Sequence, residues 1–272
     1  MADPNAEPIW FNKDDKKQQK RTSVFIATPC HSDVSMHYTQ SLLLLQKMAF
    51  ARGVGLSFQL FKSSLVTQGR NLCVAAFLND SKSTHLLFID SDIAFKPESL
   101  FNLLKTDKDV ISVPYPLKDI CWAKGEKMLK EGKLKTRHDL KYKGFYRYPF
   151  KVEDNNNIKV NNGVIEVTHS PTGFMLIKRE VIEKMIEHYG EEYEIVQENV
   201  INGSLQKINN LYNFFDTMHV PENKHYIGED FAFCKRWKAI GGKCHAYVLD
   251  EITHVGEHQY TGRFMDELIY DK

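Results

Sequence analysis

The sequence predicts an α/β protein whose central, mostly parallel sheet is flanked by helices. Short apolar runs bounded by turn residues are typical of strands that are buried on both faces. Segments with apolar residues at helical spacing lie between those runs. Over the first 113 residues, strand and helix alternate in the order of βαβ units, which predicts a doubly wound sheet with right-handed crossovers.

In this first part, each element follows from local signals. We expect strands at 22–27, 55–61, 85–89 and 109–113, and helices at 36–52, at 68–79 and after Pro97. Gly53 is typical of a position just beyond a helix end, and Pro97 of a helix start.

The alternation breaks between about residues 115 and 165. A basic, aromatic stretch at 141–148 is followed by a polar one at 154–157, so we expect a mobile insertion. Asn162-Gly163 between two alternating segments predicts a hairpin turn and a smaller antiparallel sheet. Beyond it we expect a strand at 173–177, a helix at 179–189 ended by Gly190, a helix at 231–240 closed by Gly241-Gly242, and a last strand at 245–252.

Length and composition limit the class of protein. The chain has 272 residues, of which 42% are hydrophobic and 26% charged, which excludes a disordered chain and a collagen-like one. Residues 1–20 are polar and without period, and we expect a flexible arm there, followed by a single domain over 21–272. The 36 basic and 35 acidic residues give a net charge of +1, so no global field favours nucleic acid.

Cysteine usage and hydropathy suggest a compartment. The five cysteines form no CxxC pair, which argues for reduced thiols and against a zinc ribbon or a disulfide scaffold. No apolar run approaches the roughly 18–20 residues of a membrane-spanning helix, and residues 1–21 lack the apolar core of a signal peptide. We therefore expect a soluble, cytoplasmic protein without a transmembrane segment.

The sharpest local feature is the pair Asp90 and Asp92, directly after the apolar run 85–89. In doubly wound sheets, ligands bind at the carboxyl ends of strands. Two carboxylates spaced i and i+2 in extended chain point the same way and repel each other unless a cation lies between them. Hard divalent cations prefer oxygen ligands. The alternative is a turn with a helix cap ahead of Pro97.

The chain resembles nucleotide-sugar glycosyltransferases of the GT-A fold, which carry an Asp-any-Asp metal motif. The resemblance covers roughly residues 22–262. It rests on Thr28-Pro29, Gln68-Gly69-Arg70-Asn71, Phe88-Ile89-Asp90-Ser91-Asp92-Ile93, Val113-Pro114-Tyr115-Pro116-Leu117-Lys118, Gly228-Glu229-Asp230 and His254-Val255-Gly256. It implies a nucleotide-binding half at about 21–113 and an acceptor-binding half at 114–272. More loosely, the chain is similar to capsid-glycan enzymes of large DNA viruses (chloroviruses), including xylosyltransferases, which would place it in the host cytoplasm and make UDP-xylose the donor.

For a metal, the resemblance implies that Asp90 and Asp92 hold Mn²⁺ or Mg²⁺ against the diphosphate of a UDP-sugar, with Asp92 the stronger candidate for a direct ligand. A metal there neutralises charge on the departing diphosphate. Neutral imidazole also binds such metals, and His254 is expected to complete the site, with His258 as the second choice. The alternative for His254 is an ordinary surface histidine.

For catalysis, the resemblance implies that Asp230 is the general base of an inverting transfer, with Glu229 as its substitute. The alternative is structural, because helix N-termini favour Asp and Glu. The helix dipole would lower the pKa of Asp230 and weaken it as a base, so partial burial must offset the dipole.

For the nucleotide sugar, we expect contacts from Thr28, Pro29, Arg70, Asp90, Ser91, Lys118, Gly173 and Gly256. Arg70 near a helix start is disfavoured by the dipole, which suggests another role, such as holding phosphate or a uracil carbonyl; the alternative is a solvated arginine. Gly173 and Gly256 would let the backbone approach the ligand closely, although a tight turn explains Gly173 equally well. Lys118 and Trp122 would lie on a loop over donor or acceptor, unless Trp122 packs in the core.

The sequence thus predicts a metal-dependent inverting glycosyltransferase with a glycan or glycoprotein acceptor. A retaining transferase would share the metal site without needing Asp230. A catalytically silent carbohydrate-binding protein is the alternative from another class. A phosphohydrolase with an aspartyl nucleophile is disfavoured, because two βα units precede the Asp90–Asp92 motif.

Overall fold

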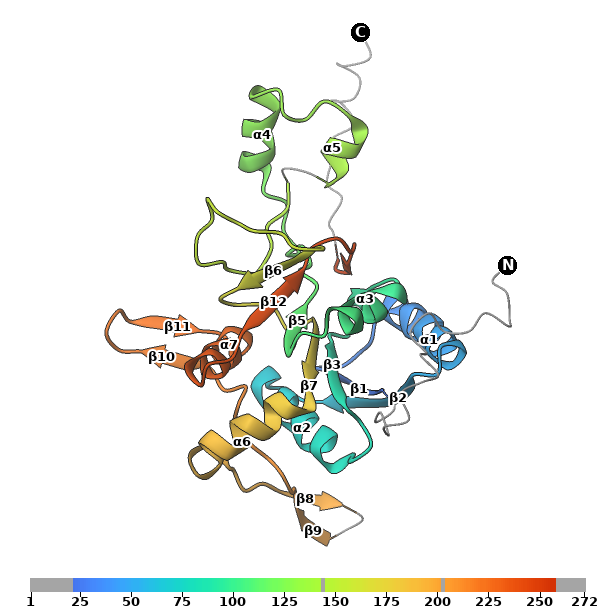
Figure 1. The fold of residues 1–272 in the computed structure, drawn as a ribbon, viewed down its shortest axis with the longest axis vertical. Coiled ribbons are helices and arrows are strands. Elements are labelled where there is room, and N and C mark those ends of the chain that lie inside the picture. Colours follow the sequence, from blue (N-terminus) through green and yellow to red (C-terminus); the bar gives the residue numbers. More distant parts are fainter. Residues whose placement is uncertain (1–21, 143–144, 202–203, 258–272) are drawn as a thin grey trace, which may run out of the picture.

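The computed structural model describes residues 22–142, 145–201 and 204–257 (Figure 1). A seven-stranded sheet forms its centre, in the order β2-β1-β3-β7-β5-β12-β6. The strands are β1 (Ser23–Cys30), β2 (Gly55–Lys62), β3 (His85–Ile89), β5 (Val110–Ser112), β6 (Val164–Val167), β7 (Phe174–Lys178) and β12 (Cys244–Tyr247).

Strand directions in this sheet agree with a mostly parallel arrangement. β1 is parallel to β2 and β3, and β5 is parallel to β12. β7 is antiparallel to both β3 and β5, so these two groups run the same way; β6 is antiparallel to β12. Five of the seven strands therefore share one direction, and the predicted α/β class is confirmed.

Helices cover both faces of the sheet. Helices α2 (Val66–Asn79), α6 (Arg179–Tyr193) and α7 (Glu229–Ala239) pack on one face, around Phe77, Met185 and Phe233. Helices α1 (Met36–Ala51) and α3 (Glu98–Thr106) pack on the other, around Leu45 and Phe101. Alternate residues of β1 and β3 enter the two cores, as the period of a strand requires.

The segment where the alternation breaks contains two short helices that the sequence did not predict, α4 (Trp122–Lys130) and α5 (Arg137–Tyr142). They lie together at one end of the molecule, away from the sheet (Figure 1). The predicted turn is confirmed, because Asn161 and Val164 bond each other across Asn162 and Gly163, and both turn residues have positive φ.

Three further pairs of short strands are antiparallel. β8 (Glu198–Ile201) pairs with β9 (Ser204–Lys207), and β10 (Met218–Val220) pairs with β11 (His225–Ile227). β4 (Ile93–Ala94) pairs with β13 (Thr253–His254), and this pair joins two segments that are far apart in the chain.

Two predicted elements differ from the structure. The helix expected to end at Gly190 continues to Tyr193, because Tyr189 and Tyr193 pack against the core on both sides of the glycine. This packing outweighs the cost of about 1 kcal/mol for a helical glycine. The single strand expected at 245–252 is divided into β12 and β13, which join different sheets.

The expected arm at 1–20 and His258 lie outside the described residues. Within the described part of the chain, none of the helices has both the length and the apolar character needed to cross a bilayer.

Candidate active site

A pocket of about 340 Å³ opens where β1, β2 and β3 end. Because these strands are parallel, their carboxyl ends meet at one edge of the sheet, where α/β proteins bind ligands. The pocket is lined by Pro29, Cys30, His31, Ser63, Ser64, Val66, Arg70, Asp90, Ser91, Asp92, Tyr115 and His254. Six of the residues expected from the sequence are therefore brought together: Pro29, Arg70, Asp90, Ser91, Asp92 and His254.

The two aspartates after β3 lie in a turn and not in extended chain. The Ile93 N–H donates to the Asp90 carbonyl at 3.1 Å, and the Asp90 N–H donates to the Gly173 carbonyl at 3.0 Å. The extended chain on which the sequence-based expectation depended is therefore absent at these two residues, and the two carboxylates, which line the same pocket, have different partners. Neither caps α3, whose N-cap position is Pro97 without a side-chain cap bond.

His254 is brought to Asp92 by the short ladder between β4 and β13. The register pairs His254 with Ile93, and the Val255 N–H donates to the Asp92 carbonyl at 2.8 Å. The two residues, 162 positions apart (254 − 92), are thus fixed side by side through their backbones.

Asp92 has two cationic or potentially cationic partners. The Lys118 Nζ lies 2.5 Å from its Oδ2, and the His254 Nε2 lies 3.6 Å from its Oδ1. The His254 Nδ1 is 2.9 Å from the Pro116 carbonyl, which can only accept, so Nδ1 carries the proton and, in a neutral ring, the lone pair of Nε2 faces Asp92. Burial alone would raise the pKa of Asp92, but His254, when its ring is charged and Nε2 donates, and Lys118 lower it to about 2.

A carboxylate oxygen and an imidazole nitrogen that face each other fit a divalent cation such as Mn²⁺. Asp90 does not join them, because its Oδ1 is paired with Arg70. Within the described ranges, no group of three or more His, Cys, Asp and Glu side chains could hold a metal ion. Of the three expected ligands, the structure therefore brings together Asp92 and His254.

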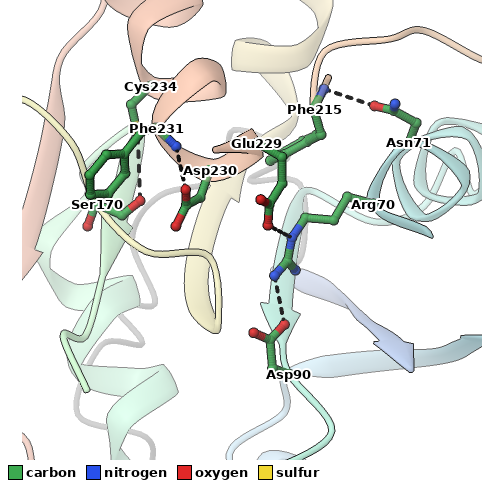
Figure 2. Close-up of polar contacts among 9 residues, drawn as sticks. All are labelled: Arg70, Asn71, Asp90, Ser170, Phe215, Glu229, Asp230, Phe231 and Cys234. Atoms are coloured by element: carbon green, nitrogen blue, oxygen red, sulfur yellow. Dashed lines mark hydrogen bonds and ion pairs between the residues drawn. The ribbon is translucent and has the colours of Figure 1, made fainter. Parts of the chain in front are cut away.

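Arg70 lies at the floor of the pocket and is 3% exposed, which excludes the alternative of a solvated arginine. Figure 2 shows its guanidinium between two carboxylates: Nη2 is 2.9 Å from the Asp90 Oδ1, and Nε is 3.4 Å from the Glu229 Oε1. Burial would lower the pKa of Arg70, but the charges of Asp90 and Glu229 outweigh burial and raise it. Its Nη1 has no hydrogen-bond partner among the described residues.

Asp230 lies next to this ion pair, in the first turn of α7 (Figure 2). Its Oδ1 accepts from the Phe231 N–H at 2.7 Å. Burial and then the charge of Glu229 raise the pKa of Asp230 to about 6, against the opposing effects of the Phe231 N–H and Arg70. Burial thus raises the pKa of Asp230 by more than the Phe231 N–H lowers it, as a base at a helix N-terminus requires.

The environments of the two adjacent carboxylates distinguish them. Glu229 is paired with Arg70, which stabilises its charge, whereas Asp230 holds its proton more firmly than an ordinary aspartate. A carboxylate with a pKa near neutrality is the better general base. This difference favours Asp230 over Glu229.

Tyr115 is a pocket residue that was not among the expected site residues. It is 8% exposed, and its ring meets His254 edge-on, with centroids 5.0 Å apart. Tyr115 follows β5, which runs in the same direction as β1 and β3, so the rule that selected Asp90 could also have selected it.

Three other expected residues have different surroundings. The Thr28 hydroxyl is buried, hydrogen-bonded to the Tyr38 hydroxyl at 2.6 Å, and does not line the pocket. A Cβ on Gly173 would lie 2.6 Å from the Tyr115 hydroxyl, and one on Gly256 would lie 2.7 Å from the Lys118 Cδ. Both glycines thus allow close approach of a side chain of this chain.

A groove of about 810 Å³ begins beside this pocket and shares His254 with it. Trp122, Tyr146 and Tyr148 line it, and Trp122 is 68% exposed, so the alternative that Trp122 packs in the core is wrong. The other lining residues include Lys118, Gly256, Asp119, Glu251 and Glu257. A larger hollow of about 950 Å³ lies elsewhere, around Asp107, Glu166 and Trp237.

No protein-family model matches the chain, and no curated protein is detectably similar in sequence. Among solved structures, protein A197 from STIV is 15% identical, with a TM-score of 0.47 over 89% of this chain and 97% of that one. A glycosyltransferase involved in glycosylation of the major capsid of PBCV-1 is 10% identical, with a TM-score of 0.30 over 62% and 67%. UDP-glucose pyrophosphorylase complexed with UDP-glucose is 11% identical, with a TM-score of 0.35 over 85% and 74%. The chain is thus similar to these three proteins at low identity, and its α/β class follows from its own strand order.

Proposed function

We propose that this protein is a metal-dependent inverting glycosyltransferase of the GT-A type, which moves a sugar from a UDP-sugar to a glycan acceptor. The observation that carries the proposal is one pocket at the carboxyl ends of the parallel strands. In it, Asp92 and His254 face each other beside a buried arginine. The carboxylate of Asp230, which has a raised pKa and is not among the residues that line the pocket, lies next to that arginine.

The donor would lie across this pocket. Asp92 and His254 would hold Mn²⁺ or Mg²⁺, which supplies neutralisation of the charge that develops on the departing diphosphate. Lys118, now paired with Asp92, can turn its ammonium to a phosphate oxygen when Asp92 takes another partner. The unpartnered Nη1 of Arg70 leaves one donor for a ligand oxygen at the pocket floor. Pro29 and Ser91 line the same pocket and would contact the nucleoside.

Asp230 would act as the base. It takes the proton of the acceptor hydroxyl while that oxygen bonds to the anomeric carbon and the bond from that carbon to the diphosphate oxygen breaks. The products are an inverted glycoside, UDP and a protonated Asp230. A pKa of about 6 leaves Asp230 ionised at neutral pH and still basic enough to accept the proton.

We place the acceptor glycan in the aromatic groove. Exposed rings such as Trp122 and Tyr148 offer apolar faces to sugar C–H groups, and the nearby carboxylates of Asp119, Glu251 and Glu257 accept hydrogen bonds from hydroxyl groups. The shared residue His254 joins this groove to the donor pocket.

The test is release of nucleoside diphosphate from a panel of UDP- and GDP-sugars, with UDP-xylose included, in the presence of Mn²⁺. We expect release from one donor, and loss of release in Asp92→Asn and in Asp230→Asn. Asp107→Asn is the matched control, because that carboxylate is exposed and lies beside the distant hollow. The anomeric configuration of the product separates an inverting from a retaining enzyme. Absence of both turnover and nucleotide binding would favour a silent carbohydrate-binding protein.

A further inference from the structure

Tyr115 lines the same pocket as His254, Arg70 and Asp90. On one side its ring packs edge-on against His254, at 74° and 5.0 Å. On the other side its hydroxyl is within electrostatic reach of Asp90, Arg70 and Asp230.

The Tyr115 hydroxyl has a backbone donor beside its oxygen, but its own proton has no side-chain acceptor among the described residues. Tyr38, which is also buried, uses its hydroxyl in a 2.6 Å bond to Thr28. For Tyr115, the group beside the oxygen is the Gly173 N–H, which is a donor, and no described side chain accepts the phenol proton in a hydrogen bond. The proton is therefore available to an acceptor atom that enters the pocket.

We propose that the Tyr115 hydroxyl donates a hydrogen bond to an oxygen of the sugar that is transferred. This inference rests on the proposed function. The diphosphate would lie at Asp92 and His254 and the acceptor hydroxyl at Asp230, so the sugar ring must lie between them. Tyr115 lines the pocket against His254, and among the described residues no other tyrosine lines it.

Gly173 sets the position of this ring. A Cβ at residue 173 would come within 2.6 Å of the Cε1, Cζ and hydroxyl oxygen of Tyr115. Since a buried ring has little room to retreat, any larger residue at 173 displaces the hydroxyl. Gly173 therefore acts as a positioning residue for Tyr115, whereas the sequence suggested that its backbone approaches the sugar directly.

The test compares two ligands that differ only in the sugar. Isothermal titration calorimetry with Mn²⁺ and without acceptor gives the Kd of UDP and of the best-bound UDP-sugar, for the full chain and its variants. We expect Tyr115→Phe to bind UDP normally and the UDP-sugar about 3- to 12-fold more weakly, as for one lost neutral hydrogen bond. Tyr38→Phe is the matched control and should change neither Kd.

A second variant distinguishes loss of a ligand contact from loss of stability. Gly173→Ala should lose the same selectivity for UDP-sugar over UDP, with a clearly lower Tm, whereas Tyr115→Phe keeps the ring against His254 and should lower Tm less, by the loss of one acceptor for the Gly173 N–H. The proposal is overturned if Tyr115→Phe binds the UDP-sugar as tightly as the unmodified protein, or if it loses UDP and UDP-sugar equally. If the unmodified protein binds neither ligand, the proposed function fails first, and this assignment fails with it.

Discussion

Two clusters of ion pairs border the pocket, and they differ in how deeply their cation is buried. In the Arg70 cluster (Arg70, Asp90 and Glu229), the arginine is 3% exposed and the carboxylates are 26% and 18% exposed. In the Asp92 cluster (Asp92, Lys118 and His254), the lysine is 40%, the aspartate 34% and the histidine 17% exposed. The two aspartates are thus similarly exposed, and the clusters differ in their permanent cation, a buried arginine or an exposed lysine. We call the Arg70 cluster the dry wall of the pocket and the Asp92 cluster the wet wall.

The difference in burial determines what each cluster can do. Breaking a buried pair leaves an uncompensated charge and is strongly destabilising, whereas an exposed pair is worth about 0–1 kcal/mol. The Arg70 cluster is therefore fixed structure, and the Asp92 cluster can exchange its lysine for another cation at little cost. Four predictions test this contrast.

The largest effect is expected at Asp230, which lies beside the dry wall. Asp230→Asn should reduce kcat about 10²- to 10⁴-fold, because the general base is lost. The same variant should raise the free energy of unfolding at pH 8. A carboxyl whose folded pKa is raised binds more protons when folded, so its ionisation destabilises the fold as pH rises through about 6.

Denaturant unfolding at pH 8 and a diphosphate-release assay check both parts. Glu229→Gln is the informative control, because it breaks the pair with Arg70 and should lower stability. An Asp230→Asn variant that is less stable at pH 8 would contradict the assigned environment of Asp230.

The next effect contrasts the two walls directly. Arg70→Met should lower the free energy of unfolding by about 3–5 kcal/mol, because Asp90 and Glu229 lose the charge between them. Lys118→Met should lower it by less than about 1 kcal/mol. Urea titrations of both variants measure the contrast, and equal losses would show that the walls do not differ.

Part of this contrast could be predicted from the sequence. The rule that ligands bind where parallel strands end selected Asp90, Asp92 and Pro29, because it needs only the order of strands and helices. The burial of Arg70 could not be predicted, since it depends on Glu229, which lies 159 residues later in the chain, at the start of α7. Tyr115 lies in the motif at 113–118 on which the GT-A resemblance rests in part, but only its contacts with Gly173 and His254 suggest a role for it.

The pH dependence of turnover extends the comparison. The pKa of Asp230, beside the dry wall, is raised, whereas the pKa of Asp92, in the wet wall, is lowered. As pH falls below about 6, Asp230 takes up its proton and kcat/KM should fall, approaching tenfold per pH unit. Asp92 contributes nothing to this limb, since its pKa is held at about 2 by His254 and Lys118. Initial rates between pH 4.5 and 8 measure the limb. A limb that persists unchanged in the residual activity of Asp230→Asn would assign it to another group.

The smallest effect tests whether the wet wall exchanges its cation. The Lys118 ammonium lies 2.5 Å from the Asp92 Oδ2, on the carboxylate that would bind Mn²⁺, so metal and lysine compete for Asp92. Removing an exposed pair of this kind should raise the affinity for Mn²⁺ about two- to fivefold in Lys118→Met without nucleotide. Free Mn²⁺ measured by electron paramagnetic resonance gives this Kd without any turnover.

Lys130→Met is the matched control for that measurement, because its 2.6 Å pair with Glu126 is equally short but lies on α4, outside the pocket. With nucleotide present, the change in Mn²⁺ affinity should have the opposite sign if Lys118 turns to the diphosphate. The variant then lacks a phosphate contact, so it should bind Mn²⁺ together with UDP more weakly than the unmodified protein does. A Lys118→Met variant with the same Mn²⁺ affinity in both conditions would show that Lys118 is a passive surface partner of Asp92. The reversal is the stronger test, because simple competition predicts tighter binding in both conditions and only exchange predicts opposite signs.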